Sequence, residues 1–320
     1  MGEKAGVRSA VIGASGIGKH HAKWWHLEGA DVCAFVGTSR ESVAKTQEAL
    51  AALFPFEGRG YTDVQAMLDA EGPDVVDVCS PAPCHYEHVR TALEAGCQVL
   101  CEKPLVFDKG VPREALMAQG RALFALADDK GGRLGVCTQY SSGALIFGEL
   151  WGEQRNDEPI THYHGHLEAP AKGRAPDPAR IWVDLSPHLI SVLLKLAPGG
   201  AVAWDTLRAH FDGYEATAEF EVRRAAGGPL ECVLVARNRT EPPPNIRHFK
   251  LNDYPFVVEG ENDADGVYCA RIETPDGHHL RPDLMRVLIG EFLAGRLVTN
   301  AEESLANLDL MLRVLEAGAQ

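Results

Sequence analysis

Short apolar runs alternate with longer amphipathic runs through the first 138 residues. The short runs are Val7–Ile12, Val32–Val36, Val75–Cys79, Val99–Cys101 and Leu134–Cys137. Such runs, with few polar positions, are typical of parallel strands that are buried on both faces. Between them lie helix-forming runs at Ile17–Glu28, Glu41–Ala51, Asp63–Asp69, His85–Glu94 and Arg113–Ala127. Strands that alternate with helices predict a doubly wound α/β fold, a parallel sheet with helices on both faces.

The pattern changes after residue 150. Residues 168–180 show no periodicity and are expected to form a loop. Alternating runs at Ala218–Val222 and Leu230–Ala236, with breaks at Gly227-Gly228-Pro229 and Pro242-Pro243-Pro244, predict hairpins of an antiparallel sheet. Helical stretches at Asp283–Leu293 and Ala301–Leu315 end the chain. The sequence therefore predicts two domains, an α/β domain over residues 1–138 and an α+β domain with a largely antiparallel, open-faced sheet over 139–320.

Composition narrows the class of protein. The chain has 320 residues, and 31 Lys and Arg against 45 Asp and Glu give a formal net charge of −14. This acidic balance argues against nucleic acid as a partner, because phosphate backbones are repelled. No apolar run approaches the roughly 20 residues of a membrane helix. The first residues lack the apolar core of a signal peptide, so we expect a cytoplasmic protein.

Eight cysteines raise the question of a disulfide or zinc framework. No two of them have the C-x-x-C spacing. Cys33, Cys79, Cys101 and Cys137 lie inside predicted strands, where cysteine packs as a small apolar residue. Reduced cysteines of a core are therefore favoured over a framework.

A glycine-rich loop follows the first predicted strand and opens the first helix. It comprises Gly13, Ala14, Ser15, Gly16, Ile17 and Gly18, with Ser15 in the place of a usual glycine. Glycines here allow a tight turn and let a pyrophosphate approach the backbone at the helix N-terminus. The alternative is an ordinary strand-to-helix turn that binds no ligand. Its position in the first strand–helix unit favours a nicotinamide dinucleotide site formed by Gly13, Ser15, Gly16, Ile17 and Gly18.

The end of the second strand bears on which nicotinamide cofactor binds. A carboxylate there would bind the ribose 2′-hydroxyl of NAD. The chain has Gly37, Thr38, Ser39 and Arg40 instead, and no acid before Glu41. Hydroxyls and a guanidinium suit a 2′-phosphate, so NADP is favoured, with NAD as the alternative.

Three motifs carry a family resemblance. They are Val11-Ile12-Gly13-x-x-Gly16-Ile17-Gly18-x-x-His21, Ser80-Pro81-x-x-x-His85 and Glu94-Ala95-Gly96-x-x-Val99-Leu100-x-Glu102-Lys103-Pro104-Leu105. The set resembles the glucose–fructose oxidoreductase, inositol dehydrogenase and rhizopine-catabolism (Gfo/Idh/MocA) family. The resemblance covers roughly residues 7–107, and a weaker one falls on Trp182–Ile190. It implies a Rossmann domain followed by a substrate-binding domain.

The resemblance also implies roles for single residues. Lys103 would reach the reacting oxygen, His188 would transfer the proton, and Asp184 would bind a substrate hydroxyl or orient the site. Ser80, Pro81 and His85 would line the cofactor, with Glu102 at its nicotinamide end. A cis bond between Lys103 and Pro104 is expected on the same ground. Departures from the family pattern fall at Ser186, Ser191 and Gln139–Ser142, and they bear on the substrate.

Elementary chemistry agrees with these roles. Hydride transfer from a carbinol carbon requires an acceptor for the hydroxyl proton, and histidine titrates near neutrality. An ammonium group next to the oxygen stabilises the charge that develops there. Asp184 and His188 are four positions apart, so on a helix they share one face. The alternatives without a catalytic role are a surface lysine at position 103 and a core or capping histidine at position 188.

The sequence thus predicts an oxidoreductase that acts on CH–OH groups of a sugar, inositol or related polyol. The alternative is a nicotinamide-binding sensor of the same fold that does not turn over substrate. A homo-oligomer formed through the C-terminal sheet is also expected.

Three alternating histidines, His162, His164 and His166, lie on one side of a strand if that segment is extended. No neighbouring cysteine or carboxylate completes a compact metal set, so no metal is expected there. A polar sheet face at a subunit contact or a substrate cleft is the favoured interpretation. His20 and His21 are treated as incidental, although His21 lies on the first helix.

Overall fold

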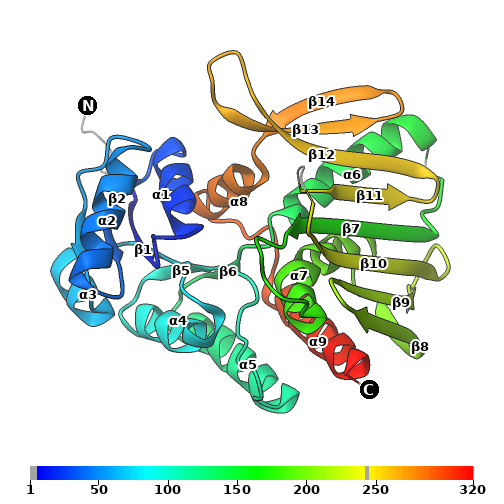
Figure 1. Cartoon of the computed structure of the whole chain (residues 1–320), viewed down its shortest axis with the longest axis horizontal. Coiled ribbons are helices and arrows are strands. Elements are labelled where there is room, and N and C mark those ends of the chain that lie inside the picture. The colour runs from blue at the N-terminus through cyan, green and yellow to red at the C-terminus, as the bar shows by residue number, and fades with distance from the viewer. Residues whose placement is uncertain (1–5, 157, 242–244, 320) are drawn as a thin grey trace. The chain divides into compact units, whose positions relative to one another are not determined.

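A computed structural model describes residues 6–156, 158–241 and 245–319 (Figure 1). The chain divides into two compact units. The first comprises Met1–Cys137 and Met285–Leu305, and the second Thr138–Leu284 and Ala306–Gln320. Pro242-Pro243-Pro244, which the sequence predicts to interrupt the second sheet, lie outside the described residues.

The first unit is built on a parallel sheet. Its strands are β1 (Arg8–Ile12), β2 (Asp31–Val36), β3 (Arg59–Tyr61), β4 (Val75–Val78), β5 (Gln98–Cys101) and β6 (Leu134–Val136). They are hydrogen-bonded in the order β3-β2-β1-β4-β5-β6, and all pairs are parallel. The doubly wound fold predicted from the sequence is confirmed. The direction of winding reverses between β1 and β4, which is where ligands bind in such sheets.

Helices cover both faces of this sheet. They are α1 (Gly18–Leu27), α2 (Arg40–Ala51), α3 (Val64–Glu71), α4 (His85–Glu94), α5 (Arg113–Asp129) and α8 (Leu284–Leu293), with a short 3₁₀ turn η1 (Ala82–Cys84). Figure 1 shows α1 and α8 on one face and α4 and α5 on the other. Asp63 caps α3, because its carboxylate accepts from the backbone N–H of Ala66 at 2.8 Å. The core between α1, α8 and the sheet includes Trp25, Phe35 and Phe292.

The second unit contains an eight-stranded sheet. Its strands are β7 (His162–Pro170), β8 (Ala201–Asp212), β9 (Glu215–Arg223), β10 (Leu230–Arg239), β11 (Arg247–Leu251), β12 (Tyr254–Asn262), β13 (Tyr268–Thr274) and β14 (Gly277–Pro282). The order is β14-β13-β12-β11-β7-β10-β9-β8, and only the β7–β10 pair is parallel. Buried and accessible positions alternate along β9 and β10, so one face of the sheet is covered and the other is open. This confirms the predicted, largely antiparallel second sheet.

Three helices complete the second unit, namely α6 (Tyr140–Arg155), α7 (Pro178–Leu196) and, in its C-terminal part, α9 (Ala301–Gly318). Helix α7 packs on β7, β9 and β10 and also on α6. It therefore lies on the covered face of the sheet. The sequence gives no prediction for α6.

The prediction of a loop over residues 168–180 is wrong at both ends. Strand β7 continues to Pro170, and α7 begins at Pro178. The strand accommodates Glu168 because this buried carboxylate forms an ion pair with Arg239 at 3.1 Å. Asp177 starts the helix by accepting from the N–H of Arg180 at 3.0 Å, and proline suits the first helical position. Only residues 171–177 connect the two elements.

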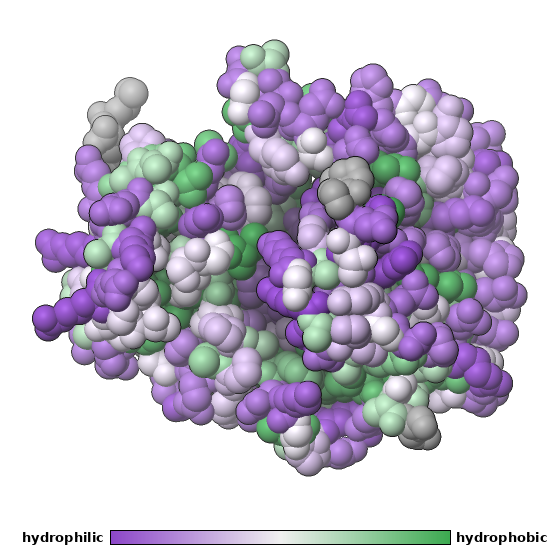
Figure 2. All heavy atoms as spheres, in the orientation of Figure 1, coloured by the Kyte–Doolittle hydropathy of each residue, from purple (hydrophilic) through white to green (hydrophobic). Residues whose placement is uncertain are grey.

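The face of the molecule in Figure 2 is mostly hydrophilic, with apolar residues in small separate areas. This distribution fits the acidic composition and the large set of buried apolar side chains. Within the part of the chain that the structure describes, no helix has the length and apolar character needed to cross a bilayer.

Candidate functional site

The glycine-rich loop follows β1 at the edge where the parallel strands end. Gly13 has a φ of 90°, and a Cβ there would lie 2.7 Å from the carbonyl oxygen of Cys79. A Cβ at Gly18 would lie 2.5 Å from the carbonyl oxygen of Gly13. Both positions therefore require glycine for the fold itself. Gly16 differs, because a Cβ there would have no heavy atom within 4 Å.

This contrast yields a prediction about two substitutions in one loop. Gly13→Ala should lower the free energy of unfolding by about 1–3 kcal/mol, because it combines a positive φ with a backbone clash. Gly16→Ala should change it by less than about 0.5 kcal/mol, as surface substitutions usually do. Gly16→Ala should instead weaken nicotinamide dinucleotide binding by roughly tenfold or more, because a methyl group would occupy the approach to the pyrophosphate.

Denaturant unfolding and fluorescence titration of the reduced cofactor measure both effects. If the Gly16→Ala protein bound the dinucleotide as tightly as the wild type, the loop would not be the pyrophosphate site.

The loop leads directly into α1, which starts at Gly18. The first N–H groups of a helix have no partner inside the helix, and this end carries the positive pole of the helix dipole. Ser15, Gly16 and Ile17 are exposed beside these groups. The open space at Gly16 and the exposed helix start fit the pyrophosphate of a dinucleotide.

The segment after β2 lies on the same edge of the sheet. Thr38, Ser39 and Arg40 are exposed, and Ser39 is the N-cap of α2. Its hydroxyl accepts from the N–H of Ser42 at 3.1 Å, which leaves its own O–H available to donate. The first acid in this segment, Glu41, pairs with Lys45 at 2.7 Å. The segment thus offers hydroxyls, a guanidinium and a helix N-terminus.

His85 connects the ends of β4 and β5. It is buried, with Nε2 2.7 Å from the carbonyl oxygen of Ser80 and Nδ1 2.9 Å from that of Pro104. Ser80 also contacts His88 through its hydroxyl at 2.9 Å, and Pro81 is exposed next to it. The Lys103–Pro104 peptide bond is cis, as expected.

A buried charged network lies beneath this edge, and the sequence analysis missed it. His21 on α1 is 1% exposed, with Nδ1 2.9 Å from the carboxylate of Asp77 and Nε2 3.1 Å from that of Glu102. Trp25 donates its indole N–H to the same Asp77 oxygen at 2.6 Å. One signal was available, since Asp77 interrupts the apolar run of β4 and a buried carboxylate requires partners.

The charge state of His21 follows from these contacts. Burial by itself lowers its pKa, but the charge and hydrogen bonds of Asp77 and Glu102 outweigh burial and raise the pKa to about 10. His21 is therefore an imidazolium at neutral pH, and both of its ring N–H groups donate to carboxylates.

Lys103 follows Glu102 and is half-buried. Its positive charge acts on the Cys137 thiol, which follows β6. Burial raises the pKa of that thiol well above its usual range, and Asp77 and Glu102 raise it further while Lys103 opposes them. The lysine thus lies at the carboxyl ends of the strands, on the edge that also carries the glycine-rich loop.

The remaining predicted residues lie in the second unit. Asp184 and His188 are one turn apart on α7 and both are half-buried. The imidazole of His188 packs edge-on against Tyr140, the first residue of α6, with ring centroids 5.3 Å apart. Burial raises the pKa of Tyr140 to about 12, although Arg247 acts in the opposite direction. The phenol therefore remains protonated beside His188, and Tyr140 is a second residue that the sequence analysis did not identify.

Hydrogen bonds from α9 and within α7 hold the histidine's backbone in place. Asn307 donates to the carbonyl oxygen of Pro187 at 2.8 Å, and Trp182 donates to that of Met311 at 3.0 Å. Ser191 donates its hydroxyl to the carbonyl oxygen of His188 at 2.8 Å. Pro187 lies inside the helix and provides no backbone donor. The bonds to the carbonyl oxygens of Pro187 and His188 tie this turn to α9 and to the next turn of α7.

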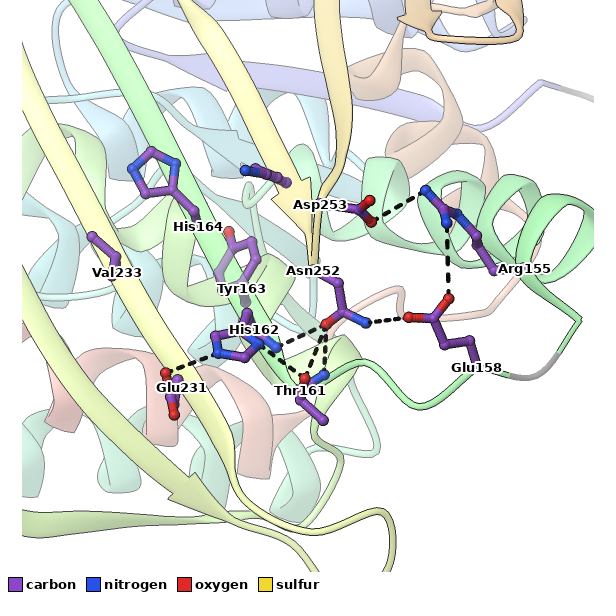
Figure 3. Close-up of a pocket in the computed structure, with 11 residues that line it drawn as sticks. Arg155, Glu158, Thr161, His162, Tyr163, His164, Glu231, Val233, Asn252 and Asp253 are labelled. Atoms are coloured by element: carbon purple, nitrogen blue, oxygen red, sulfur yellow. Dashed lines mark hydrogen bonds and ion pairs between the residues drawn. The ribbon is translucent and has the colours of Figure 1, made fainter.

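The alternating histidines lie on β7, and two of them border a groove of about 740 Å³ (Figure 3). His162 forms an ion pair with Glu231 at 3.0 Å. Asn252 accepts hydrogen bonds from the backbone N–H groups of Thr161 and His162. Its side-chain amide donates to the carboxylate of Glu158 (Figure 3). The contacts of Asn252 fix the turn before β7.

In the described part of the chain, one set of potential metal ligands has its donor atoms within 4.8 Å of one another, namely His21, Asp77 and Cys137. Both ring nitrogens of His21 already face carboxylate oxygens at hydrogen-bond distance. The Cys137 thiol is held protonated by burial. The set therefore fits a hydrogen-bonded network better than a metal centre.

The strand order, the loop at the end of β1 and the helix that follows define a dinucleotide-binding Rossmann domain. Residues 7–138 match the family model described as "Oxidoreductase family, NAD-binding Rossmann fold". In sequence this domain is therefore similar to oxidoreductases of the Gfo/Idh/MocA family.

Two curated relatives illustrate the match. The chain is 41% identical over 138 residues to D-glucoside 3-dehydrogenase of Escherichia coli (strain K12), covering 42% of this chain and 37% of that protein. It is 36% identical over 169 residues to inositol 2-dehydrogenase of Streptomyces avermitilis, covering 52% of this chain and 46% of the relative. The matches therefore span less than half the length of these relatives.

Solved structures extend the likeness in fold to the whole chain. UDP-N-acetylglucosamine 3-dehydrogenase GnnA from Acidithiobacillus ferrooxidans superposes with a TM-score of 0.73 and 20% identity, covering 98% of each chain. At this identity the likeness concerns the fold alone.

Proposed function

We propose that the protein is an NAD(P)-dependent oxidoreductase that transfers hydride between a nicotinamide and a carbinol or carbonyl carbon of a sugar, inositol or related polyol. The observation that carries the proposal is that two candidate site segments lie at the same edge of the first unit's sheet, where its parallel strands end. There, an open glycine-rich loop and the Glu102–Lys103 turn lie on one Rossmann sheet. The dehydrogenases named above, which by name act on glucosides and inositol, support the substrate class.

Cofactor binding is assigned to residues at this edge. Gly13, Ser15, Gly16, Ile17 and Gly18 would hold the pyrophosphate, and Ser80, Pro81, His85 and Glu102 would line the ribose and nicotinamide end. The observed fit is the space at Gly16 beside the exposed start of α1. When bound, the nicotinamide accepts or supplies the hydride.

The catalytic roles fall to Lys103, His188 and Asp184. In the oxidative direction, the C–H bond of the carbinol breaks and its electron pair leaves with the hydride. His188 takes the hydroxyl proton as the C=O bond forms, and Lys103 stabilises the charge on that oxygen. Asp184, one turn before His188, binds a neighbouring substrate hydroxyl.

A panel of sugars, inositols and sugar derivatives tests the proposal. Each is mixed with the whole protein and NAD or NADP, and the absorbance of the reduced nicotinamide is followed. Turnover of at least one polyol is expected. Tight cofactor binding without turnover across the panel would favour the sensor alternative.

We also propose NADP as the preferred cofactor. The segment after β2 supports this, since it presents Thr38, Ser39 and Arg40 at a helix N-terminus and its first acid is engaged by a lysine. A 2′-phosphate gains from these donors and from the guanidinium, whereas a 2′-hydroxyl has no carboxylate to bind.

Arg40→Ala should weaken NADP(H) binding by roughly 10-fold to 100-fold, as expected for the loss of a charge-assisted hydrogen bond of about 1.5–3 kcal/mol. NAD(H) binding should change less than threefold. Glu48→Ala is the matched control, because it removes an exposed charge from the same helix. Fluorescence titration of each protein with both reduced cofactors gives the six dissociation constants. The NADP assignment fails if the wild type binds NAD more tightly, or if Arg40→Ala weakens both cofactors equally.

Finally, we propose that the chain forms a homo-oligomer through the open face of its second sheet. The support is that β7 to β10 leave this face uncovered by helices, with partly exposed histidines along β7. Sedimentation of the whole chain tests it, and a monomer at micromolar concentration would contradict it.

A further inference from the structure

An arginine and two tyrosines of the second unit lie at one end of its sheet, on the face that the helices cover. Arg247 starts β11, two positions before the buried Phe249, and so shares its face of the sheet. It pairs in register with Leu167 of β7, which is 3% exposed. Tyr140, the first residue of α6, packs on Phe249 with ring centroids 5.1 Å apart. The start of α6 is therefore next to the start of β11.

Tyr268 brings a second phenol to this end of the sheet. It starts β13 and pairs with Asn262 at the end of β12. Phe249 pairs with Phe256 of β12 on the covered face. Asn262 lies an even number of positions after Phe256, so Tyr268 is on this face too. A Cβ at Gly260 would collide with the Tyr268 hydroxyl, so the glycine leaves room for the phenol, which remains 43% exposed.

Arg247 supplies the positive charge of this group. Its side chain is half-buried, and it forms no ion pair with any residue that the structure describes. Its charge and a hydrogen bond act on the Tyr140 hydroxyl and lower its pKa, against the larger effect of burial. Tyr268 and the buried Asp283 raise the pKa, each less strongly than the charge of Arg247 lowers it. The strongest charge acting on this hydroxyl is thus that of a half-buried guanidinium.

Tyr140 also borders the proposed proton acceptor. Its ring meets the imidazole of His188 edge-on, with centroids 5.3 Å apart, whereas its hydroxyl interacts with Arg247. A substrate whose reacting oxygen lies at His188 would therefore meet Arg247 with another part of the molecule.

The chemistry of the three side chains indicates what that part is. A guanidinium binds a carboxylate or a phosphate through two parallel N–H···O bonds, and a phenol O–H donates to the same anion. A phosphate monoester carries a charge of about −1.5 to −2 near neutrality. One guanidinium, with the acidic Asp283 also acting at this place, suits the single charge of a carboxylate better.

We propose that Arg247, together with the hydroxyls of Tyr140 and Tyr268, binds a carboxylate of the substrate, so that the polyol that reacts beside His188 is a sugar acid. The carboxylate is on a carbon other than the reacting one, and Arg247 determines specificity without taking part in the chemical step. This inference rests on the proposed function for its catalytic consequence, whereas the carboxylate subsite is a binding property that needs no turnover.

Matched substrates provide the first test. Each neutral hexose of a panel is compared with the uronate and the 6-phosphate of the same configuration, and kcat/KM is measured with the wild-type protein. A uronate should exceed its hexose by roughly tenfold or more, as expected for a hydrogen bond to a charged group. Equal values for hexose and uronate would overturn the subsite. A preference for the 6-phosphate over the uronate would overturn the assignment to a carboxylate.

Substitutions at position 247 test the residue itself. Arg247→Gln should raise KM for the preferred uronate roughly 10-fold to 100-fold and leave kcat within threefold, because a contact remote from the reacting carbon binds ground state and transition state alike. The constants for the neutral hexose should stay within threefold. Arg247→Lys should give an intermediate KM, since an ammonium keeps the charge but not the planar fork.

Lys250→Gln is the matched control, because it removes an exposed cation from the opposite face of the same strand. It should leave the preference for the uronate unchanged. An equal loss for uronate and hexose in Arg247→Gln would make the residue structural and overturn the proposal.

Calorimetric titration with uronates, in the presence of the reduced cofactor, gives a readout without turnover. The wild type should bind at least one uronate more tightly than the matching hexose, and Arg247→Gln should lose this difference. Tyr268→Phe, which removes only a hydroxyl from an exposed ring, should reduce uronate affinity roughly threefold or more.

Thermal unfolding shows whether each variant is folded, and Arg247→Lys and Tyr268→Phe carry the test if Arg247→Gln is not. Absence of uronate binding to the wild type, or an unchanged preference in folded Arg247→Gln, would overturn the subsite. Uronate binding that depends on Arg247, without turnover of any polyol, would overturn only the proposed function.

Discussion

Lys103→Met should abolish measurable turnover, lowering kcat by about 10³-fold or more, while leaving cofactor binding within threefold of the wild type. Methionine keeps most of the length of the side chain and removes the ammonium group that we propose stabilises charge on the reacting oxygen. The cofactor retains the glycine-rich loop and the start of α1, which we propose bind its pyrophosphate, and these elements do not depend on the lysine.

The matched control is Lys109→Met, six residues later in an exposed turn. Steady-state rates and fluorescence titration of the reduced nicotinamide measure the two quantities separately. If Lys103→Met kept a tenth of the wild-type rate, the ammonium would have no role in the chemical step. A loss of cofactor affinity that matched the loss of rate would make Lys103 a binding residue.

The sequence predicts the first sheet well, because its strands are buried on both faces and their local pattern is enough to identify them. β4 illustrates this, since Val75, Val76 and Val78 are all buried. Asp77 in the same strand carries information that pattern alone does not resolve. Its burial implies partners, but only the fold shows that His21 and Trp25 from α1 supply them.

Packing between distant segments is what the local pattern does not contain. Helix α8 is predicted correctly as a helix, yet nothing in its sequence says that Phe292 packs edge-on against Trp25, with ring centroids 6.0 Å apart. The extension of β7 through Glu168 was likewise missed because it depends on contacts with a segment distant in the sequence. A carboxylate before Ala169 and Pro170 is typical of a loop, and arginines on the adjacent β10 make the buried position tolerable.

The substrate is the least predictable feature for a related reason. The side chains around His188 come from separate segments, Tyr140 from α6 and Ser191 from α7 itself. Ser191, named as a departure from the family pattern that bears on the substrate, donates its hydroxyl to the backbone carbonyl of His188 and so has a structural role. The surroundings of the proposed proton-transfer residue therefore depend on the fold of the second unit.

His188→Ala should lower kcat by roughly 10² to 10⁴, the range for the loss of one general base. It should also change the pH dependence of the oxidative reaction. An imidazole must be neutral to accept the hydroxyl proton, so the wild-type rate should rise with pH through a transition near neutrality. The reductive reaction should show the opposite slope, because the imidazolium then donates. In the variant, both slopes should disappear in this pH range.

The surroundings of His188 make this result specific to the imidazole. Tyr140, which packs against the ring, has a pKa raised by burial to about 12, so it does not ionise in the same pH range and cannot produce the transition. His162→Ala removes an exposed histidine of the same unit and should leave both the rate and the transition unchanged. If His188→Ala retained the transition, another group would be the proton acceptor. If it retained the full rate as well, α7 would only shape the substrate pocket, and the assignment of proton transfer to this helix would be lost.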